Sequence, residues 1–317
     1  MVISVFLLLV GFGGLILTAN LFVEGAVKVA GILKWPTLLV SLTLVALGTS
    51  APELVVSSVA AMKGSDIALS NVLGSNIINI ALVAGFTGIL SPILIKTSAR
   101  KEIVIMVIVE AALILLLING YVLSGTDGAI LIILLAVFLY YTFKSKKTEA
   151  IADESSNESS SKLFKFLLAL IPNEAFISAI FIISGLGGLI ISGNIVVNSA
   201  VRIAKFYGMS EALIGATIVA IGTSLPELVT SLIAVFRKEY DVVLGNIVGS
   251  NILNILFILG LSAIISPLHF TQELWLQAGV MLLCAVLLLV FSFTNKVGKF
   301  AGIVLLGTYA AFIVISF

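Results

Sequence analysis

The two halves of this chain are copies of one another. The stretch GTSAPEL at Gly48–Leu54 recurs as GTSLPEL at Gly222–Leu228, and 11 of the 15 residues around it are identical at a spacing of 174. A second stretch, Leu69–Ile80, recurs at Leu244–Ile255 with 8 of 12 residues identical at a spacing of 175. Any fold for this chain must therefore accommodate the same unit twice.

The composition suits a lipid bilayer rather than water. Hydrophobic residues make up 60% of the 317 positions and charged residues 10%, with a mean hydropathy of +1.26, whereas a soluble domain carries about 25% charged residues. A membrane-spanning helix needs about 20 mostly apolar residues. Ten such runs follow one another: Val2–Leu33, Thr37–Met62, Ile67–Ile95, Ile103–Val122, Ala129–Phe143, Ala175–Ala204, Ala212–Phe236, Val242–Ile265, Leu274–Phe293 and Phe300–Phe317.

A polar stretch divides the ten runs into two sets of five. The sequence KSKKTEAIADESSNESSSK at Lys144–Lys162 is rich in serine and glutamate and has no apolar periodicity, which is typical of a linker. We predict a first five-helix repeat at 1–143, a linker with a possible interfacial helix at 144–172, and a second repeat at 173–317. Because five spans precede the second copy, that copy enters the membrane from the opposite side, so the repeats are inverted.

The loops differ in basic charge. With the N-terminus outside, the cytoplasmic loops hold 14 of the 17 lysine and arginine residues, and the external loops hold three, Lys63, Arg202 and Lys205. Basic residues are retained on the cytoplasmic side of membranes. We therefore expect a multi-pass protein of the cell membrane with both termini extracellular and the linker cytoplasmic.

Each GTSxPEL stretch places a glycine, a proline and a glutamate inside an apolar run. Gly48 is conformationally permissive and Pro52 lacks a backbone N–H, so the span should break there. Irregular backbone at membrane depth survives only around a buried or water-filled site. A glutamate in a span indicates function by default. Two glutamates in matching positions, Glu53 and Glu227, make helix packing alone an inadequate explanation.

The repeated stretches supply oxygen atoms rather than nitrogen or sulfur. They hold hydroxyls, amides, the two glutamates and the free carbonyls of broken helices, while the single histidine, His269, lies near a loop and the single cysteine, Cys284, lies in an apolar run. Oxygen ligands suit calcium and sodium better than zinc or copper. Two ionised carboxylates carry a charge of about −2, which matches one divalent ion.

Asn20, Asn194, Glu24 and Glu110 are further polar residues of the apolar runs. Asn20 and Asn194 match at the spacing of 174 and are expected to form interhelical hydrogen bonds. Glu24 lies near the end of its run, where we expect the membrane interface. Glu110 has no counterpart in the other copy. We expect it to pair with a neighbouring helix or to face another protein, with a role in the site as the minor alternative.

Taken together, the four motifs resemble the two alpha repeats of the sodium/calcium exchangers, within the cation/calcium antiporter superfamily, and most of all its compact prokaryotic members. The resemblance covers essentially the whole chain. It implies an all-α polytopic membrane protein with ten transmembrane helices, arranged as two inverted five-helix repeats with helices 2, 3, 7 and 8 broken. Those four helices would form the ion-binding core, and the long first and sixth helices would slide over it to alternate access.

The resemblance also implies a set of ligands, which are glutamate carboxylates, backbone carbonyls, hydroxyls and amides. The implied calcium ligands are Glu53, Glu227, Thr49 and Thr223. The implied sodium ligands are Ala46, Thr49, Ser50 and Ser250 on one side and Ala220, Thr223, Ser224 and Ser75 on the other. Asn79 and Asn254 complete the centre.

One position departs from several relatives. The potassium-dependent branch, among others, has an aspartate where this chain has Asn254, so we predict exchange without potassium. The proton/calcium branch carries GNxxE-type motifs in place of GTSxPE and fits less well. We therefore predict an electrogenic sodium/calcium antiporter that works by alternating access. A proton/calcium exchanger and, with less support, a calcium-permeable channel remain alternatives.

An enzyme fits the sequence poorly. An intramembrane hydrolase would need an acid–base pair on a face that substrate can reach, and nothing beyond the two glutamates suggests one. The expected partners are the transported calcium and sodium ions and the lipid bilayer, with no cofactor and no nucleic acid.

Overall fold

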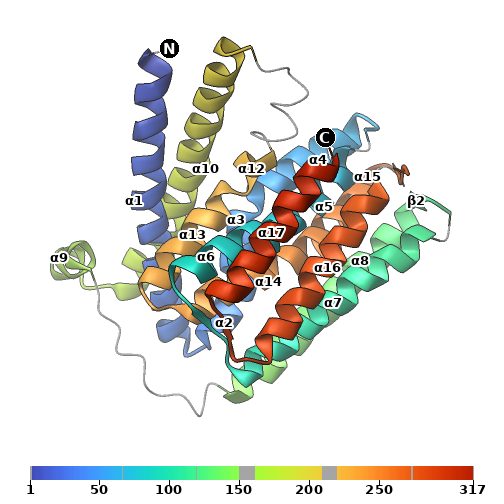
Figure 1. Cartoon of the computed structure of the whole chain (residues 1–317). Helices are drawn as coiled ribbons and strands as arrows, with labels where there is room; N and C mark the ends of the chain where they lie inside the picture. Colours follow the sequence, from blue (N-terminus) through green and yellow to red (C-terminus); the bar gives the residue numbers. More distant parts are fainter. Residues whose placement is uncertain are drawn as a thin grey trace.

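The apolar runs fold into helices that lie side by side, with four strands of two residues each between them (Figure 1). The structure is a computed structural model that describes residues 2–65, 67–118, 120–149, 161–208, 220–272 and 274–316. The predictions made for 150–160 and for 212–219 lie outside these described residues.

The elements of the first half begin with the longest run and end at the polar stretch. They are α1 (Val2–Leu33), α2 (Thr37–Val40), the π-helical segment η1 (Ser41–Val45), α3 (Ala46–Thr49), α4 (Ala51–Met62), α5 (Ile67–Ile77), the π-helical segment η2 (Ile78–Ala84), α6 (Gly85–Leu90), β1 (Ile93–Leu94), α7 (Thr97–Ile118), β2 (Val122–Leu123) and α8 (Gly125–Glu149).

The second half repeats this order after one additional short helix. Its elements are α9 (Lys162–Leu170), α10 (Glu174–Phe206), α12 (Ala220–Thr223), α13 (Leu225–Phe236), α14 (Tyr240–Leu253), the π-helical segment η5 (Asn254–Leu259), α15 (Gly260–Ile265), β3 (Leu268–His269), α16 (Leu274–Ser292), β4 (Lys296–Val297) and α17 (Lys299–Ser316).

The helices are those of a multi-pass membrane protein. Within the described residues, seven helices are long and apolar enough to cross a membrane, and the bent run from Thr37 to Met62 makes an eighth. α7 is 22 residues long but carries several charged side chains, among them Glu110. The run predicted at Ala212–Phe236 is described only from Ala220 onwards. The all-α, polytopic class predicted from the sequence is therefore confirmed.

Two of the four predicted helix breaks are present. One lies at Ser50, between α3 and α4, where the helix bends by 51°, and the other lies at Ser224, between α12 and α13. The predicted breaks in the third and eighth helices are wrong, because Ile67–Leu90 and Tyr240–Ile265 are each continuous. Neither contains a proline. Each instead contains a π-helical segment, which keeps the backbone hydrogen-bonded through a wider turn.

The two longest helices, α1 and α10, pack along each other and stand apart from the other helices at the end that carries the N-terminus (Figure 1). A glycine makes this close crossing possible, since a Cβ atom on Gly185 would lie 2.6 Å from the backbone nitrogen of Phe22. Small residues at such crossings let two backbones approach closely in a membrane. α1 also packs against α13, so the pair adjoins the broken helices.

Two antiparallel ladders connect the halves of the chain. β1 pairs with β4, with Ile93 opposite Val297, and β2 pairs with β3, with Val122 opposite His269. The sequence spacing of 175 carries β1 onto β3 and Val122 onto Val297. The spacing therefore relates the β1–β4 ladder to the β2–β3 ladder, because each strand of one ladder corresponds to a strand of the other in the opposite half of the chain.

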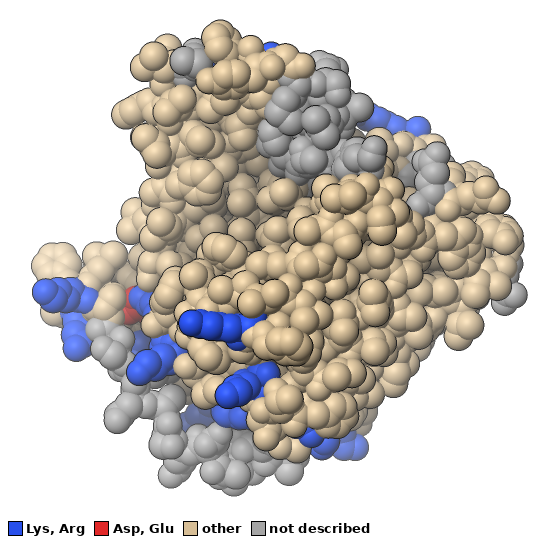
Figure 2. Space-filling view, viewed as in Figure 1, with Lys and Arg blue, Asp and Glu red and all other residues tan. Residues whose placement is uncertain are grey.

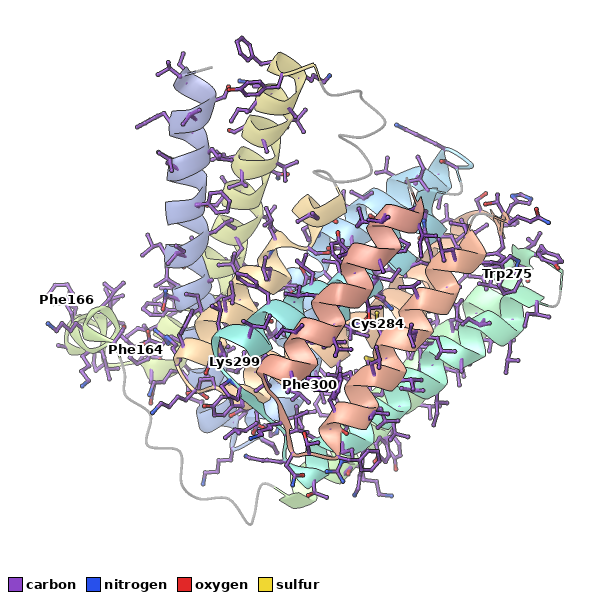
Figure 3. All side chains as sticks on the ribbon, viewed as in Figure 1. Phe164, Phe166, Trp275, Cys284, Lys299 and Phe300 are labelled. Atoms are coloured by element: carbon purple, nitrogen blue, oxygen red, sulfur yellow. The ribbon has the colours of Figure 1, made fainter. Side chains whose placement is uncertain are left out.

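Helix extends into both ends of the predicted linker. α8 continues to Glu149, past the predicted boundary at 143, and α9 lies where the interfacial helix was predicted. On α9, Phe164 is 1% exposed and meets the Phe181 ring edge-on, whereas Phe166 is 61% exposed and points away from the bundle (Figure 3). One face of α9 thus packs on α10, and apolar side chains remain on the other.

Charged side chains are unevenly distributed over the surface. Figure 2 shows one face of the molecule, with a broad region free of charged residues and with most of the lysines and arginines gathered at the end opposite the N-terminus. That end carries the start of α17, where Lys299 lies (Figure 3). The distribution is the one that a helical bundle would show if it crossed a bilayer between a basic and a less basic side.

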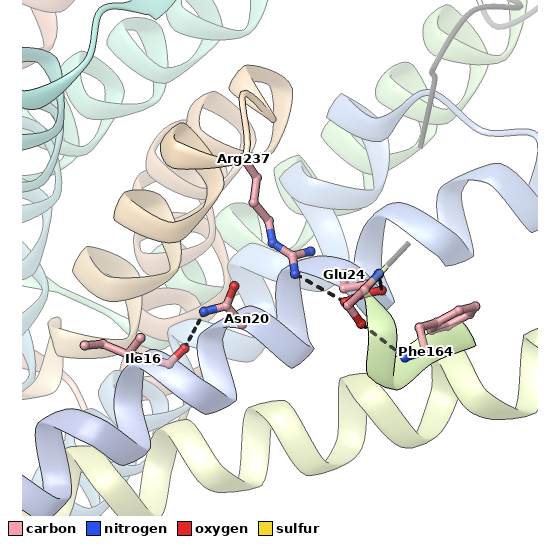
Figure 4. Close-up of polar contacts among 6 residues, drawn as sticks. Ile16, Asn20, Glu24, Phe164 and Arg237 are labelled. Carbon is pink, nitrogen blue, oxygen red and sulfur yellow. Dashed lines mark hydrogen bonds and ion pairs between the residues drawn. The ribbon is translucent and has the colours of Figure 1, made fainter. Parts of the chain in front are cut away.

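Glu24 lies buried within the protein and joins three helices (Figure 4). Its carboxylate accepts a hydrogen bond from Nη2 of Arg237, at the end of α13, at 3.2 Å, and another from the backbone N–H of Ser161, which caps α9, at 2.8 Å. Asn20, one turn earlier, donates to the Ile16 carbonyl of its own helix at 2.9 Å. The interhelical bond predicted for Asn20 is therefore not the one it forms.

We expect Arg237→Ala to destabilise the protein measurably. Glu24 would keep a buried charge without its ionic partner, because its side chain is only 5% exposed. Removing one member of a buried pair costs about 3–5 kcal/mol and of a surface pair about 0–1 kcal/mol. Arg237 is 29% exposed, so we expect an intermediate loss of about 1–3 kcal/mol, measured by unfolding in detergent.

The matched control is the more exposed pair between Lys96 and Asp241, whose side chains are 58% and 24% exposed at an N–O distance of 3.0 Å. Lys96→Ala should cost less than about 1 kcal/mol. Equal losses in the two variants would contradict a stabilising role for the Glu24 cluster.

Candidate cation-binding site

The two GTSxPEL stretches form matching interruptions. Ser50 has φ and ψ of −81° and 9°, and Ser224 has −90° and 9°. In each case a proline stands at the second position of the helix that follows. Pro52 has no N–H to donate to the Gly48 carbonyl one turn earlier, so the helical ladder is interrupted there. The glutamates then fall in the first turn of α4 and of α13, with their carboxylates at the interruptions.

The two buried glutamates are held by serines from the opposite copy. Ser50 donates through Oγ to Oε1 of Glu227 at 2.9 Å, and Ser224 donates to Oε1 of Glu53 at 3.2 Å. Ser75, on α5, is a second donor to the same oxygen of Glu53 at 3.4 Å. The exposed fractions of Glu53 and Glu227 are 0% and 1%. The two GTSxPEL stretches therefore meet at their carboxylates.

Several buried oxygen atoms around these glutamates have no hydrogen-bond donor among the residues that the structure describes. They are the second carboxylate oxygen of Glu53, that of Glu227 and the amide oxygens of Asn79 and Asn254. Burying an oxygen without a partner is costly, and a bound cation would provide one. No three His, Cys, Asp or Glu side chains come together in the described part of the chain. A cation here would therefore bind two carboxylates and neutral oxygens.

Neutral oxygens come from the junction of α3 with α14. The Ala46 carbonyl lies 3.5 Å from Oγ of Ser250 and 3.3 Å from Oγ1 of Thr49. Gly249 makes this junction possible, since a Cβ atom there would lie 2.7 Å from the Leu42 carbonyl oxygen. At Gly74, the counterpart of Gly249, an added Cβ atom would have no heavy atom of another described element within 4 Å.

The remaining predicted ligands occupy the surrounding helices. Asn254 begins η5 and donates through Nδ2 to Oδ1 of Asn76 at 3.0 Å. Asn79 lies in η2, which packs against α13 and α14. Thr223 ends α12, next to the interruption at Ser224. Ala220 begins α12, and its side chain lies outside what the structure describes.

Asn246 is a buried residue of this region that was not among the predicted ligands. Its Nδ2 donates to the backbone carbonyl of Glu227 at 3.1 Å and to Oγ of Ser231 at 3.0 Å, and its Oδ1 accepts from Oγ1 of Thr49 at 2.9 Å. Asn71, its counterpart at the spacing of 175, donates to Ser57 at 3.1 Å. The recurrence of this asparagine in both copies was the sequence signal that could have identified it.

Glu110 lies on α7, outside the four repeated stretches. Its exposed fraction is 0%, and neither carboxyl oxygen has a hydrogen-bond partner among the described residues. The prediction that it faces another protein is therefore wrong, because neighbouring helices of the same chain enclose it. α7 packs against α14 and α16, and Cys284 of α16, in the interior of the bundle (Figure 3), is close enough to interact electrostatically with Glu110.

Comparison with known proteins gives consistent matches. The family model described as sodium/calcium exchanger protein matches residues 3–144 and 177–317. A putative antiporter, CaxA, from Alkalimonas amylolytica is 38% identical over 84% of this chain and 82% of its own length. The sodium/calcium exchanger MaX1 from Methanosarcina acetivorans is 29% identical over 99% of both chains.

A solved structure extends the match to three dimensions. The sodium-calcium exchanger NCX_Mj, soaked with 2.5 mM Na+ and 0.1 mM Ca2+, superposes with a TM-score of 0.84 at 30% identity, covering 99% of this chain and 98% of its own. The two segments that match the family model contain all four repeated stretches and both buried glutamates. The chain therefore belongs to the sodium/calcium exchanger family of membrane antiporters.

Proposed function

We propose that this protein exchanges sodium for calcium across the membrane and that Glu53 and Glu227 bind the calcium ion. The observation that carries the proposal is the reciprocal bonding of these two glutamates. Each accepts a hydrogen bond from the serine that precedes the other glutamate by three residues, and each keeps one buried oxygen to which no described residue donates. This pair supplies two charges and free oxygens at one point between the copies.

The charge and the kind of ligand decide which ion goes where. Calcium prefers six to eight oxygen ligands that include carboxylates, so it occupies the centre between the glutamates together with the carbonyls of Thr49 and Thr223. Sodium tolerates neutral oxygens and binds on either side of that centre. The proposed sodium ligands are Ala46, Thr49, Ser50 and Ser250 on one side and Ala220, Thr223, Ser224 and Ser75 on the other. Asn79 and Asn254 complete the centre.

The proposed architecture is ten spans in two inverted repeats, at 1–143 and 173–317. Support comes from the matching interruptions at Ser50 and Ser224, from the π-helical segments η2 and η5 that follow corresponding motifs, and from the strand ladders that exchange under the same spacing. An odd number of spans in each repeat requires the inversion.

Alternating access is the proposed transport mechanism. α1 and α10 pack against each other and adjoin the broken helices. The pair is therefore placed to slide across the site and to expose it to one side of the membrane at a time. The excess of basic residues at one end (Figure 2) supports extracellular termini and a cytoplasmic 144–172 segment.

The deciding experiment is calcium flux in proteoliposomes with the purified protein. We expect calcium uptake to follow an outward sodium gradient and to stop when that gradient is removed. Uptake driven by a proton gradient alone would identify a proton/calcium exchanger. Downhill uptake that needs no counter-ion would identify a channel, and both results would overturn the proposal.

Acid should compete with calcium. Protonation of Glu53 or Glu227 removes a negative charge and blocks an acceptor oxygen, so protons and calcium exclude one another. We expect the half-saturating calcium concentration to rise as pH falls, while saturating calcium restores the rate. Calcium uptake measured against calcium concentration at several pH values checks this. A fall in maximal rate without a change in half-saturation would contradict direct competition.

A further inference from the structure

Asn246 is buried at the meeting point of three helices and has no unpaired buried polar atom. It lies on α14, bonds to the first two turns of α13 through Glu227 and Ser231, and bonds to the end of α3 through Thr49. It therefore connects the two copies through one amide, immediately beside the candidate cation site.

The partners of Asn246 fix which way its amide faces. The Glu227 carbonyl can only accept a hydrogen bond, so it must face the Asn246 nitrogen at 3.1 Å and not the oxygen. Turning the amide over would place two carbonyl oxygens against each other and would turn the nitrogen toward Thr49. The oxygen of Asn246 is therefore held toward the Thr49 hydroxyl, at 2.9 Å.

The Thr49 hydroxyl has one proton and two acceptors at hydrogen-bonding distance. The Asn246 oxygen is at 2.9 Å and the Ala46 carbonyl at 3.3 Å, and the Glu227 carboxyl group lies close by. A hydroxyl can donate to only one of them. The shortest contact is the one to Asn246, which carries the proton away from both Ala46 and Glu227.

We infer that Asn246 is a positioning residue that orients the Thr49 hydroxyl so that its oxygen lone pairs remain available to a cation. The Ala46 carbonyl already accepts the backbone N–H of Ser50 at 3.0 Å, and this orientation keeps the Thr49 proton off it. If the proton instead pointed at Ala46 or Glu227, it would occupy an oxygen that a cation needs, and its positive end would repel that cation. Asn246 itself does not bind the ion, because its donors and its oxygen are directed at protein groups.

The inference deepens the proposed function and rests on its assignment of the site. Thr49 and Ala46 contribute neutral oxygens, whereas the two glutamates contribute the charge. Calcium depends chiefly on the carboxylates and sodium on neutral oxygens. Loss of the Asn246 contact should therefore weaken sodium binding more than calcium binding.

The test is a double-mutant cycle read in cation binding to the purified protein. Calcium titration by calorimetry at increasing sodium gives both dissociation constants without requiring transport. We expect Asn246→Ala to raise the dissociation constant for sodium roughly 3- to 10-fold, which corresponds to the loss of one hydrogen bond. The dissociation constant for calcium should change less. Thr49→Val, which keeps the shape and removes the hydroxyl, should do the same.

The combination decides the role of Asn246. In Asn246→Ala with Thr49→Val, the sodium constant should equal that of Thr49→Val alone, because no hydroxyl remains to be oriented. If the two substitutions raise the sodium dissociation constant by factors that multiply in the double variant, the inference is wrong. It is also wrong if Asn246→Ala shifts the sodium and calcium dissociation constants equally or shifts neither. If Asn246→Ala does not fold, Asn246→Ser replaces it, since its hydroxyl stops about one bond short of Thr49.

One control variant separates orientation from general damage. Ser231→Ala removes one partner of the Asn246 amide but leaves the Glu227 carbonyl to hold it, so the ratio of the sodium to the calcium dissociation constant should not change. Failure of sodium-driven calcium uptake by the unmodified protein would overturn the proposed function, while the binding cycle would still decide the role of Asn246.

Discussion

Glu53→Gln and Glu227→Gln should each abolish calcium transport while leaving the protein folded. Glutamine has nearly the same shape and size, and its amide oxygen can still accept the serine bond at 3.2 Å or 2.9 Å. What is lost is one of the two negative charges. Two unit charges 4 Å apart interact by about 4 kcal/mol at an effective dielectric constant of 20. A loss of that size lowers calcium affinity about a thousandfold.

The matched control is Glu110→Gln. Glu110 is as fully buried as Glu53 and also has carboxyl oxygens without a hydrogen-bond partner, but it lies on α7, outside the repeated stretches. We expect this variant to retain exchange. The measurement is calcium uptake into proteoliposomes, with circular dichroism to confirm folding. Substantial uptake by either Glu53→Gln or Glu227→Gln would show that the site is wrongly assigned, and loss of uptake in Glu110→Gln would mean that the site extends to α7.

The position of the candidate site followed from the sequence because two independent features coincide there. Pro52 and Pro226 can only interrupt a helix, so the ends of the half-helices, and the glutamates beside them, were predictable from covalent structure alone. The duplication then required the two interruptions to meet, since inverted copies related by an in-plane axis approach each other at matching positions. The bonds between Ser50 and Glu227 and between Ser224 and Glu53 agree with that reasoning.

The predicted breaks in the third and eighth helices failed for a physical reason. The repeated stretches Leu69–Ile80 and Leu244–Ile255 contain glycine and short polar side chains, which weaken a helix. They have no proline, so no backbone donor is missing. The backbone of Ile67–Leu90 can therefore stay hydrogen-bonded, and the strain appears as the π-helical segment η2. Residue pattern alone does not separate a broken helix from a widened one, because both place an irregular turn at the same residues.

Contacts between residues far apart in the chain were beyond sequence reasoning. Glu24 was expected at the membrane interface, but its partner Arg237 follows 213 positions later, and nothing in the local sequence connects the two. The same holds for Asn246, whose bonds to Glu227 and Thr49 depend on how closely α14 packs against α3. Local pattern reveals which residues are unusual in a membrane, and tertiary packing determines their partners.

Exchange should be electrogenic. The site holds two carboxylates, and its two central asparagines, Asn79 and Asn254, carry no charge, so the fixed charge is about −2. One calcium ion balances it. Three sodium ions, the number implied by the resemblance to the family, would leave one positive charge on the moving site. Each charge that crosses the full membrane contributes about 2.3 kcal/mol per 100 mV, so 100 mV should change the calcium gradient that sodium sustains by about 50-fold.

Sodium-driven calcium uptake into vesicles at clamped potentials measures this effect. An interior made positive should increase uptake when sodium leaves the vesicle, because the cycle then carries net positive charge outward. Uptake that ignores the potential would require an electroneutral exchange of two sodium ions for one calcium ion and would refute the charge count.

Potassium should have no effect on the unmodified protein. The amide of Asn254 is held by its bond to Asn76 at 3.0 Å, and its oxygen, a proposed ligand, carries no formal charge. Asn254→Asp would raise the fixed charge to about −3 when the new carboxylate is ionised, enough to balance one further monovalent cation beside calcium. The comparison is uptake with and without potassium in both proteins, at the same clamped potential. A requirement for potassium in the unmodified protein would mean that neutral oxygens suffice to bind it, and the argument from charge would then fail.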